Sequence, residues 1–112
     1  MEEGPAFKRL TPLEQRQRMT GLQGWTVNEG RLEKEYRFKD FVQVLVFLNK
    51  AINPIEENMS YPRITIAYNR LKLSLMTTAA GAITSLDFEM AMELDRLAGG
   101  SAEQTEQRGI KA

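Results

Sequence analysis

Hydrophobic and polar residues follow a helical spacing near the start of the chain. Thr11 and Glu14 form a capping box, and Pro12 stands at the first helical position, where its missing N–H needs no partner. Gly21 then supplies the flexible backbone on which helices commonly end. The pattern therefore predicts a short first helix that ends near Met19.

From Trp25 onward, apolar residues alternate with polar ones, as they do in half-buried strands. A turn sequence at residues 28–30 interrupts the alternation, which predicts a β-hairpin. Lys34 falls on the apolar side of the second strand, and we expect it near a sheet edge, where an inward charge is tolerated. Trp25 and Phe38 are expected to fill the core rather than to stack on a ligand.

A second helix is predicted between Asp40, which can cap it, and the pair Asn53-Pro54, which ends it. The residues expected to face the core recur at helical spacing and are Phe41, Val44, Leu45, Leu48 and Ile52. A further apolar set, Val42, Val46 and Phe47, cannot be buried completely by a helix that covers one face of a small sheet. We therefore expect this set to contact a partner.

The second half of the chain repeats the order of hairpin and helix. Ile64, Ile66 and Tyr68 alternate with polar residues, Asn69-Arg70 is a candidate turn, and a second alternating run follows at 71–75. A loop is expected through Glu56, Ser60, Tyr61 and Pro62, before this hairpin.

Thr84 and Asp87 then form a second cap pattern, which predicts a third helix that closes at Gly99-Gly100. The order α-β-β-α-β-β-α predicts an α+β domain, with a four-stranded antiparallel sheet and three helices on one face. We expect this domain to span residues 10–98, between a flexible N-terminus at 1–9 and a disordered polar tail at 99–112.

Composition narrows the classes of function. Lysine and arginine number 15 and aspartate and glutamate number 15, so the net charge of zero argues against nucleic acid as a partner. Cysteine and histidine are both absent, which removes disulfides, thiolate metal sites and the common metal ligands; we expect neither a metal nor a cofactor. No apolar run is long enough to span a membrane, and no export signal opens the chain, so we expect a soluble cytoplasmic protein.

Several stretches together resemble the pterin-4a-carbinolamine dehydratase family. In the first half they are Leu10-Thr11, Gly24-Trp25 and Phe38-Lys39-Asp40-Phe41. In the second half they are Glu56, Pro62, Tyr68-Asn69, Leu75, Thr77, Gly81, Ile83-Thr84 and Asp87. The resemblance covers Leu10 to about Leu97 and implies that Glu56, Ser60, Tyr61, Pro62, Lys72 and Asp87 match positions of the family's site.

At these positions the chain departs from the family's pattern, in which histidines move protons as water leaves the pterin ring. Ser60 and Tyr61 replace an adjacent histidine pair, Lys72 replaces a third histidine, and Thr78 replaces a further one. Histidine is the side chain that ordinarily titrates near neutral pH, whereas phenols and ammonium groups titrate at about pH 10. We therefore expect no catalytic residue and no dehydratase activity. Asp87 is expected to act mainly as the capping partner of Thr84.

A chain that retains the residues of the family's fold but lacks its proton-carrying histidines favours a binding role over catalysis. Among degenerate relatives, the chain looks most like the assembly factors of α-carboxysome bacteria. That resemblance implies an assembly chaperone for ribulose-bisphosphate carboxylase (Rubisco), whose subunits would be the partners. Two alternatives remain: a dehydratase with a rebuilt site that uses Lys72 and Tyr61, and a dimerisation partner of a transcription factor.

The surplus apolar residues and the open sheet edges also predict self-association into a homodimer or larger assembly. The residues expected to contact partners are Val42, Val46, Phe47, Tyr61 and Tyr68.

Overall fold

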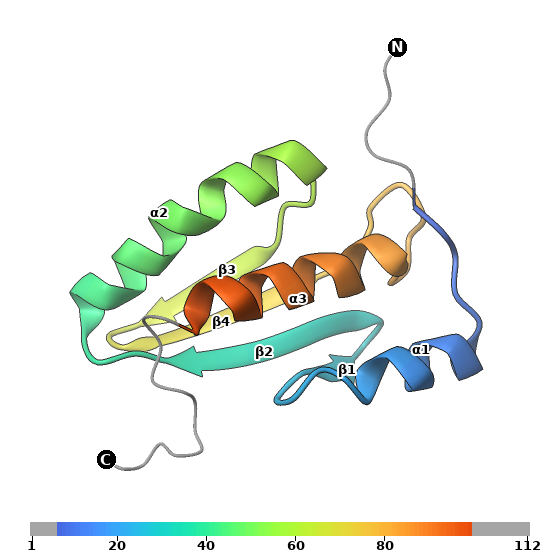
Figure 1. Ribbon diagram of the computed structural model, residues 1–112, viewed down its shortest axis with the longest axis horizontal. Coiled ribbons are helices and arrows are strands. Elements are labelled where there is room, and N and C mark those ends of the chain that lie inside the picture. The colour runs from blue at the N-terminus through green and yellow to red at the C-terminus, as the bar shows by residue number, and fades with distance from the viewer. Residues whose placement is uncertain (1–6, 100–112) are drawn as a thin grey trace.

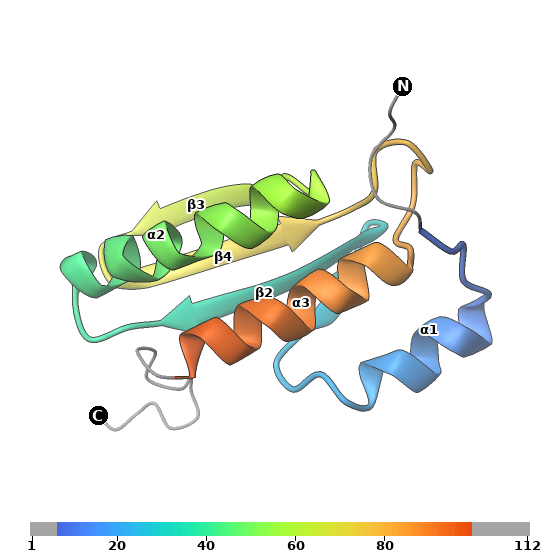
Figure 2. The ribbon, with the colours of Figure 1, turned by 45° about the horizontal axis from the view of Figure 1, so that its top comes forward.

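The computed structural model describes residues 7–99 and has the predicted α+β architecture. Its elements are α1 (Pro12–Met19), β1 (Thr26–Asn28), β2 (Arg31–Arg37), α2 (Phe41–Asn58), β3 (Arg63–Ala67), β4 (Arg70–Leu75) and α3 (Ser85–Ala98). The four strands form one antiparallel sheet in the order β1-β2-β4-β3. Helices α2 and α3 run side by side along one face of this sheet, and α1 lies beside the β1 edge (Figures 1 and 2). The predicted fold class is confirmed.

Local sequence signals set most of the element boundaries. The Thr11–Glu14 and Thr84–Asp87 capping boxes both form. The first hairpin turns at Glu29 and Gly30, whose φ angles of 51° and 75° match a tight turn between twisted strands. The turn of the second hairpin is Tyr68-Asn69, one residue earlier than predicted.

Helix α2 does not end at Asn53-Pro54 as predicted, but continues to Asn58 with Pro54 inside it. Proline removes one backbone donor, and the carbonyl that loses its partner belongs to Lys50, on an exposed part of the helix. The helix ends instead at Met59, where φ is 51°, and the N–H of Ser60 donates to the carbonyl of Ile55 at 3.2 Å. Glu56 is therefore a helical residue and not a loop residue.

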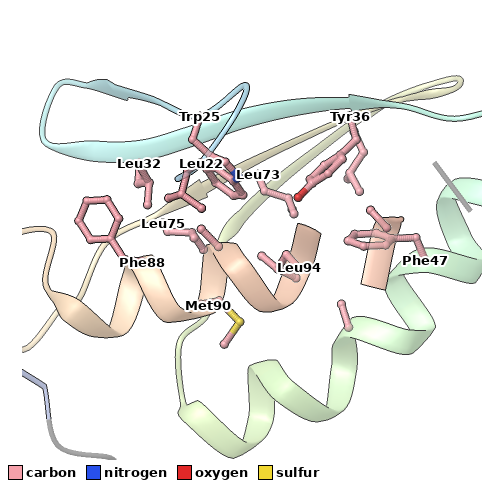
Figure 3. Close-up of a cluster of buried hydrophobic side chains, with 14 of the residues drawn as sticks. Leu22, Trp25, Leu32, Tyr36, Phe47, Leu73, Leu75, Phe88, Met90 and Leu94 are labelled. Atoms are coloured by element: carbon pink, nitrogen blue, oxygen red, sulfur yellow. The ribbon is translucent and has the colours of Figure 1, made fainter. Parts of the chain in front are cut away.

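The core lies between the sheet and the pair α2 and α3. Figure 3 shows Leu32, Tyr36, Leu73 and Leu75 of the sheet facing Phe88 and Leu94 of α3 and Phe47 of α2. Trp25 and Phe38 are buried, as predicted.

The face of α2 that is buried differs from the predicted one. The buried residues are Val44, Phe47 and Ala51, whereas Phe41, Leu45 and Ile52, which were expected in the core, are exposed. Phe47 has an exposed fraction of 0% and packs against Tyr36 and Phe38, so it cannot contact a partner. Of the surplus set, Val42 is 61% exposed and Val46 is half-buried.

Lys34 was expected near an edge, but β2 is an interior strand. The ammonium group is satisfied instead by a carboxylate of α3, since Lys34 Nζ lies 2.9 Å from Asp95 Oδ1. The same carboxyl group accepts hydrogen bonds from the hydroxyl of Tyr36 and the indole N–H of Trp25. A tertiary ion pair, and not edge position, explains this inward charge.

Hydrogen bonds connect the segment before α1 to α3. Lys8 exchanges hydrogen bonds with Ser85, and Arg9 bridges to Thr84, so the segment before α1 is attached to the start of α3. The remainder of the predicted flexible N-terminus and the predicted tail from residue 100 lie outside the described residues. Within residues 7–99, no helix combines the length and the apolar character needed to cross a membrane.

Candidate active site

The structure brings Glu56 and Tyr61 together at the end of α2. The left-handed residue Met59 reverses the chain after the last helical turn, and the bond from Ser60 to Ile55 fixes the reversal. Tyr61 is thereby placed beside the last turn of α2, where its hydroxyl donates to Glu56 Oε1 at 3.2 Å. Both side chains are open to solvent, and Tyr61 is 58% exposed.

The surroundings of Tyr61 keep its phenol protonated. Partial desolvation raises the pKa of Tyr61, and the negative charge of Glu56 and the hydrogen bond to it raise this pKa further. Tyr61 is therefore a proton donor at neutral pH, and Glu56 is the acceptor beside it. This arrangement can pass a proton between the phenol, the carboxylate and a bound molecule.

The other family-matching residues do not join this pair. Ser60 is buried and contributes its backbone N–H to the end of α2. Lys72 lies on the outer face of the sheet, the face that α2 and α3 do not cover, and its ammonium pairs with Glu33 at 3.5 Å. Lys72 is thus held by a carboxylate of β2 and has no recorded contact with Tyr61.

Asp87 is buried beneath the start of α3 and organises the loop that precedes the helix. Its Oδ2 accepts from the hydroxyl of Thr77 at 2.7 Å and from the backbone N–H of Thr84 at 2.9 Å. The two threonine hydroxyls also contact each other at 2.7 Å. These contacts agree with the predicted capping role and extend it across the loop.

Burial raises the pKa of Asp87, while its hydrogen bonds and the positive charge of Arg31 act in the opposite direction. Its Oδ1 has no hydrogen-bond partner among the described residues. Thr78, in the same loop, is exposed. Among residues 7–99, no group of histidine, cysteine, aspartate or glutamate side chains gathers in a way that could hold a metal ion.

Sequence reasoning did not find the Glu56–Tyr61 pair. The two residues are five positions apart, and this spacing has no meaning in a loop. The predicted stop at Asn53-Pro54 had placed both residues in such a loop. No local signal marked the reversal, since it uses Met59, and not a glycine, in the left-handed conformation.

Comparison with known proteins gives a consistent result over the described chain. The sequence profile of the family described as Pterin 4 alpha carbinolamine dehydratase matches residues 8–97. A protein of Nostoc punctiforme, named "Putative pterin-4-alpha-carbinolamine dehydratase", is 39% identical over 88 residues, which cover 79% of this chain and 95% of that protein. A protein of Sulfurisphaera tokodaii with the same name is 38% identical over 92 residues, covering 81% of this chain and 98% of that protein.

A solved structure shares the fold. The crystal structure of a protein from Brucella melitensis, described as a transcriptional coactivator/pterin dehydratase, superposes with a TM-score of 0.78 at 30% sequence identity. The match covers 82% of this chain and all of that chain.

These matches overturn two expectations. The chain was expected to be an inactive homologue and an assembly chaperone for Rubisco, but its relatives are named for the dehydratase, and none of these matches points to Rubisco. The expectation of inactivity rested on the missing histidines, and a rebuilt site that uses Lys72 and Tyr61 was the alternative. A phenol hydrogen-bonded to a carboxylate can also transfer a proton, and Tyr61 and Glu56 stand in that relation.

The family resemblance therefore holds at three levels: the order of helices and strands, the sequence profile over residues 8–97, and the identity shared with relatives along nearly their whole length. The chain belongs to the pterin-4a-carbinolamine dehydratase family.

Proposed function

We propose that the protein removes water from the carbinolamine of a 4a-hydroxylated pterin, with Tyr61 and Glu56 in place of the histidines. The hydrogen bond between these two residues, at positions that match the family's site, supports the proposal. In a carbinolamine, a hydroxyl group and a nitrogen share one carbon. Dehydration breaks the C–O bond, forms a C=N bond and releases the proton of the nitrogen.

The pair can supply both proton transfers. The phenol of Tyr61 gives its proton to the departing hydroxyl, which leaves as water while the nitrogen lone pair forms the C=N bond. The carboxylate of Glu56 takes the proton from the nitrogen and returns it to the phenolate through their hydrogen bond. The pair ends in its starting state, and the products are the imine and one water molecule.

The acceleration expected from this pair is modest. General acid–base catalysis typically contributes about 10²- to 10⁴-fold, and it is most effective when the pKa of the group lies near the working pH. The pKa of Tyr61 is raised from an ordinary value that is already well above neutral pH. We therefore place the contribution near the lower end of that range, at about 10²-fold.

The rate of dehydration of a synthetic 4a-hydroxytetrahydropterin, followed by ultraviolet absorbance, tests the proposal. Tyr61→Phe should lose most of the acceleration, and Glu56→Gln should lose about tenfold because the phenol then lacks its proton acceptor. Glu57→Gln is the matched control, since Glu57 is an exposed neighbour with no recorded partner. A wild-type protein that does not exceed the uncatalysed rate would refute the proposal.

We also infer that the protein associates with itself. Exposed apolar side chains gather on α2 and on the edge strand β3, and they are Phe41, Val42, Leu45, Ile52, Ile64 and Ile66. Apolar surface of this kind is commonly covered in an assembly, and an open strand edge also offers backbone groups for pairing. A homodimer or larger assembly would cover both.

A further inference from the structure

The outer face of the sheet, turned away from α2 and α3, is rich in charged residues. Strand alternation places on it Arg31, Glu33, Glu35, Arg37, Arg63, Arg70 and Lys72. Towards the β1 side these charged groups are paired. The hydroxyl of Ser74 accepts a hydrogen bond from Arg31 and donates one to Glu33, and Glu33 forms an ion pair with Lys72. The cations outnumber the carboxylates, so the face as a whole is positive.

Part of the excess positive charge lies at the end of the sheet where β2 leads into α2. Arg37 and Arg70 are directly opposite each other on neighbouring antiparallel strands. Arg70 Nε lies 3.7 Å from Glu35 Oε2, whereas Arg37 has no hydrogen-bond or ion-pair partner among residues 7–99. Like charges directly opposite one another destabilise a sheet, so the fold itself gains nothing from this pair.

The two arginines are held in register and cannot separate easily. The backbone N–H of Phe38 donates to the carbonyl of Asn69 at 2.8 Å, and the side-chain amide of Asn69 donates to the carbonyl of Phe38 at 3.0 Å. These bonds attach the end of β2 to the turn between β3 and β4. Because Phe38 is buried, this connection is also anchored in the core.

Tyr68 stands in the same turn, two residues before Arg70, and is unusual in two ways. Its φ of 56° is in the left-handed region, which a bulky aromatic residue seldom occupies. Its side chain is 68% exposed, the largest exposure recorded among the large apolar side chains of the described chain. The two-residue turn between β3 and β4 accounts for the positive φ, as at Glu29 in the first hairpin, but it does not require an exposed aromatic side chain at this position.

We infer that Arg37, Arg70 and Tyr68 form a binding site for an acidic segment of a partner protein. Guanidinium groups bind carboxylates through paired, charge-assisted hydrogen bonds, and a carboxylate between the arginines would relieve their repulsion. The exposed ring of Tyr68, in the turn that leads into Arg70, offers apolar contact area. Tyrosine and arginine are among the residues enriched at the energetic centre of protein interfaces.

A protein partner fits this site better than a nucleic acid does. Glu35 and Glu33 follow Arg37 along the outer face of β2, so a continuous phosphate backbone would meet carboxylates one step beyond the arginines. A short acidic segment meets only the positive end. This end of the sheet lies at the far end of β3 from Tyr61, so the inference does not rest on the proposed activity.

Binding of a fluorescein-labelled hexaglutamate peptide to the full chain, measured by fluorescence anisotropy at low ionic strength, tests the inference. Arg37→Gln and Arg70→Gln should each weaken binding about tenfold, because each removes a charge-assisted contact. Arg16→Gln is the matched control: Arg16 is exposed on α1 and has no recorded partner in the described chain, so its removal should leave binding unchanged.

A second readout separates binding from structure. Tyr68→Gly removes the ring and relieves the strain, so peptide binding should weaken while the unfolding midpoint stays the same or rises. Arg37→Gln should likewise not lower the midpoint, since it removes a repulsion. Absent peptide binding, or an equal loss in Arg16→Gln, would overturn the inference. Tighter binding of an oligothymidylate of equal charge, lost in the same arginine variants, would assign the site to nucleic acid instead.

Discussion

Replacement of Asp95, a partly buried carboxylate of α3 that contacts the sheet, by alanine should destabilise the protein. Asp95 accepts hydrogen bonds from the ammonium of Lys34 at 2.9 Å, from the hydroxyl of Tyr36 at 2.5 Å and from the indole N–H of Trp25 at 3.1 Å. The Lys34 side chain is only 11% exposed. Asp95→Ala therefore leaves two hydrogen-bond donors without their acceptor, and it leaves the nearly buried ammonium of Lys34 without a counter-charge and with only the carbonyl of Gln23 to accept from it, at 3.0 Å.

The size of the effect follows from these contacts. Breaking a buried ion pair by removing one partner costs about 3–5 kcal/mol, and an orphaned buried donor costs about 1–3 kcal/mol. Asp95 itself is 29% exposed, so water can enter the vacated space and partly replace the lost acceptor. We therefore expect the free energy of unfolding to fall by about 3 kcal/mol, at the low end of the range.

Urea denaturation followed by the fluorescence of Trp25, the single tryptophan, measures this loss at the site itself. Circular dichroism gives an independent signal for the whole fold. Glu89→Ala is the control, because Glu89 is exposed on the same helix and has no recorded partner in the described chain, so the midpoint should not move.

A double-mutant cycle with Lys34→Met completes the test. If the ion pair accounts for the effect, the double variant should be more stable than the sum of the single losses predicts, by about 2 kcal/mol. A loss below about 1 kcal/mol in Asp95→Ala, without coupling to Lys34, would refute the reasoning.

Three further predictions concern the core, the buried acid and the assembly. Leu94→Ala, at a fully buried position, should lower the free energy of unfolding by about 3 kcal/mol in urea titration, whereas Leu13→Ala, at an exposed position, should change it little. The raised pKa of Asp87 means that its contribution to stability is fully present below its unfolded pKa and is lost as pH rises through the folded pKa. The unfolding free energy of wild type relative to Asp87→Asn should therefore decrease between acidic and neutral pH, and an increase would contradict the assignment. Light scattering should show wild type larger than the 12.8 kDa monomer and Val42→Glu shifted towards the monomer, and a monomeric wild type would contradict self-association.

Local signals predicted the elements of the fold, because each depends on residues close in sequence. The caps at Thr11 and Thr84 and the turn ending in Gly30 act within a few residues, and they appear where expected. Pro54 did not end α2 as predicted. The energetic cost of a proline inside a helix depends on whether water can reach the backbone carbonyl that loses its hydrogen bond. That condition depends on how α2 sits on the sheet and cannot be read from the sequence.

The buried face of α2 was misjudged for a similar reason. Apolar residues surround most of this helix, so periodicity alone cannot choose between Phe41 and Phe47. The choice is made by the aromatic contacts of Phe47 with Tyr36 and Phe38, which belong to another element. Lys34 is a parallel case, since its carboxylate partner is 61 residues away in the sequence.

The pairing of Glu56 with Tyr61 could not be predicted from the sequence. The family pattern marked Glu56 and Tyr61, but the missing histidines were interpreted as a loss of activity. Whether a phenol can carry a proton depends on its neighbours, and the neighbour of Tyr61 is set by the left-handed reversal at Met59.

The attachment of Lys8 to Ser85 has a consequence for the order of folding. The two residues are separated by 77 positions, whereas each hairpin closes within a few residues and the β2–β4 ladder joins residues about forty positions apart. During synthesis, Lys8 leaves the ribosome long before Ser85 exists. The hairpins can form early, the central ladder must wait for β4, and the segment before α1 can dock only after α3 has emerged. The segment before α1 is therefore synthesised early but is among the last parts of the chain to dock.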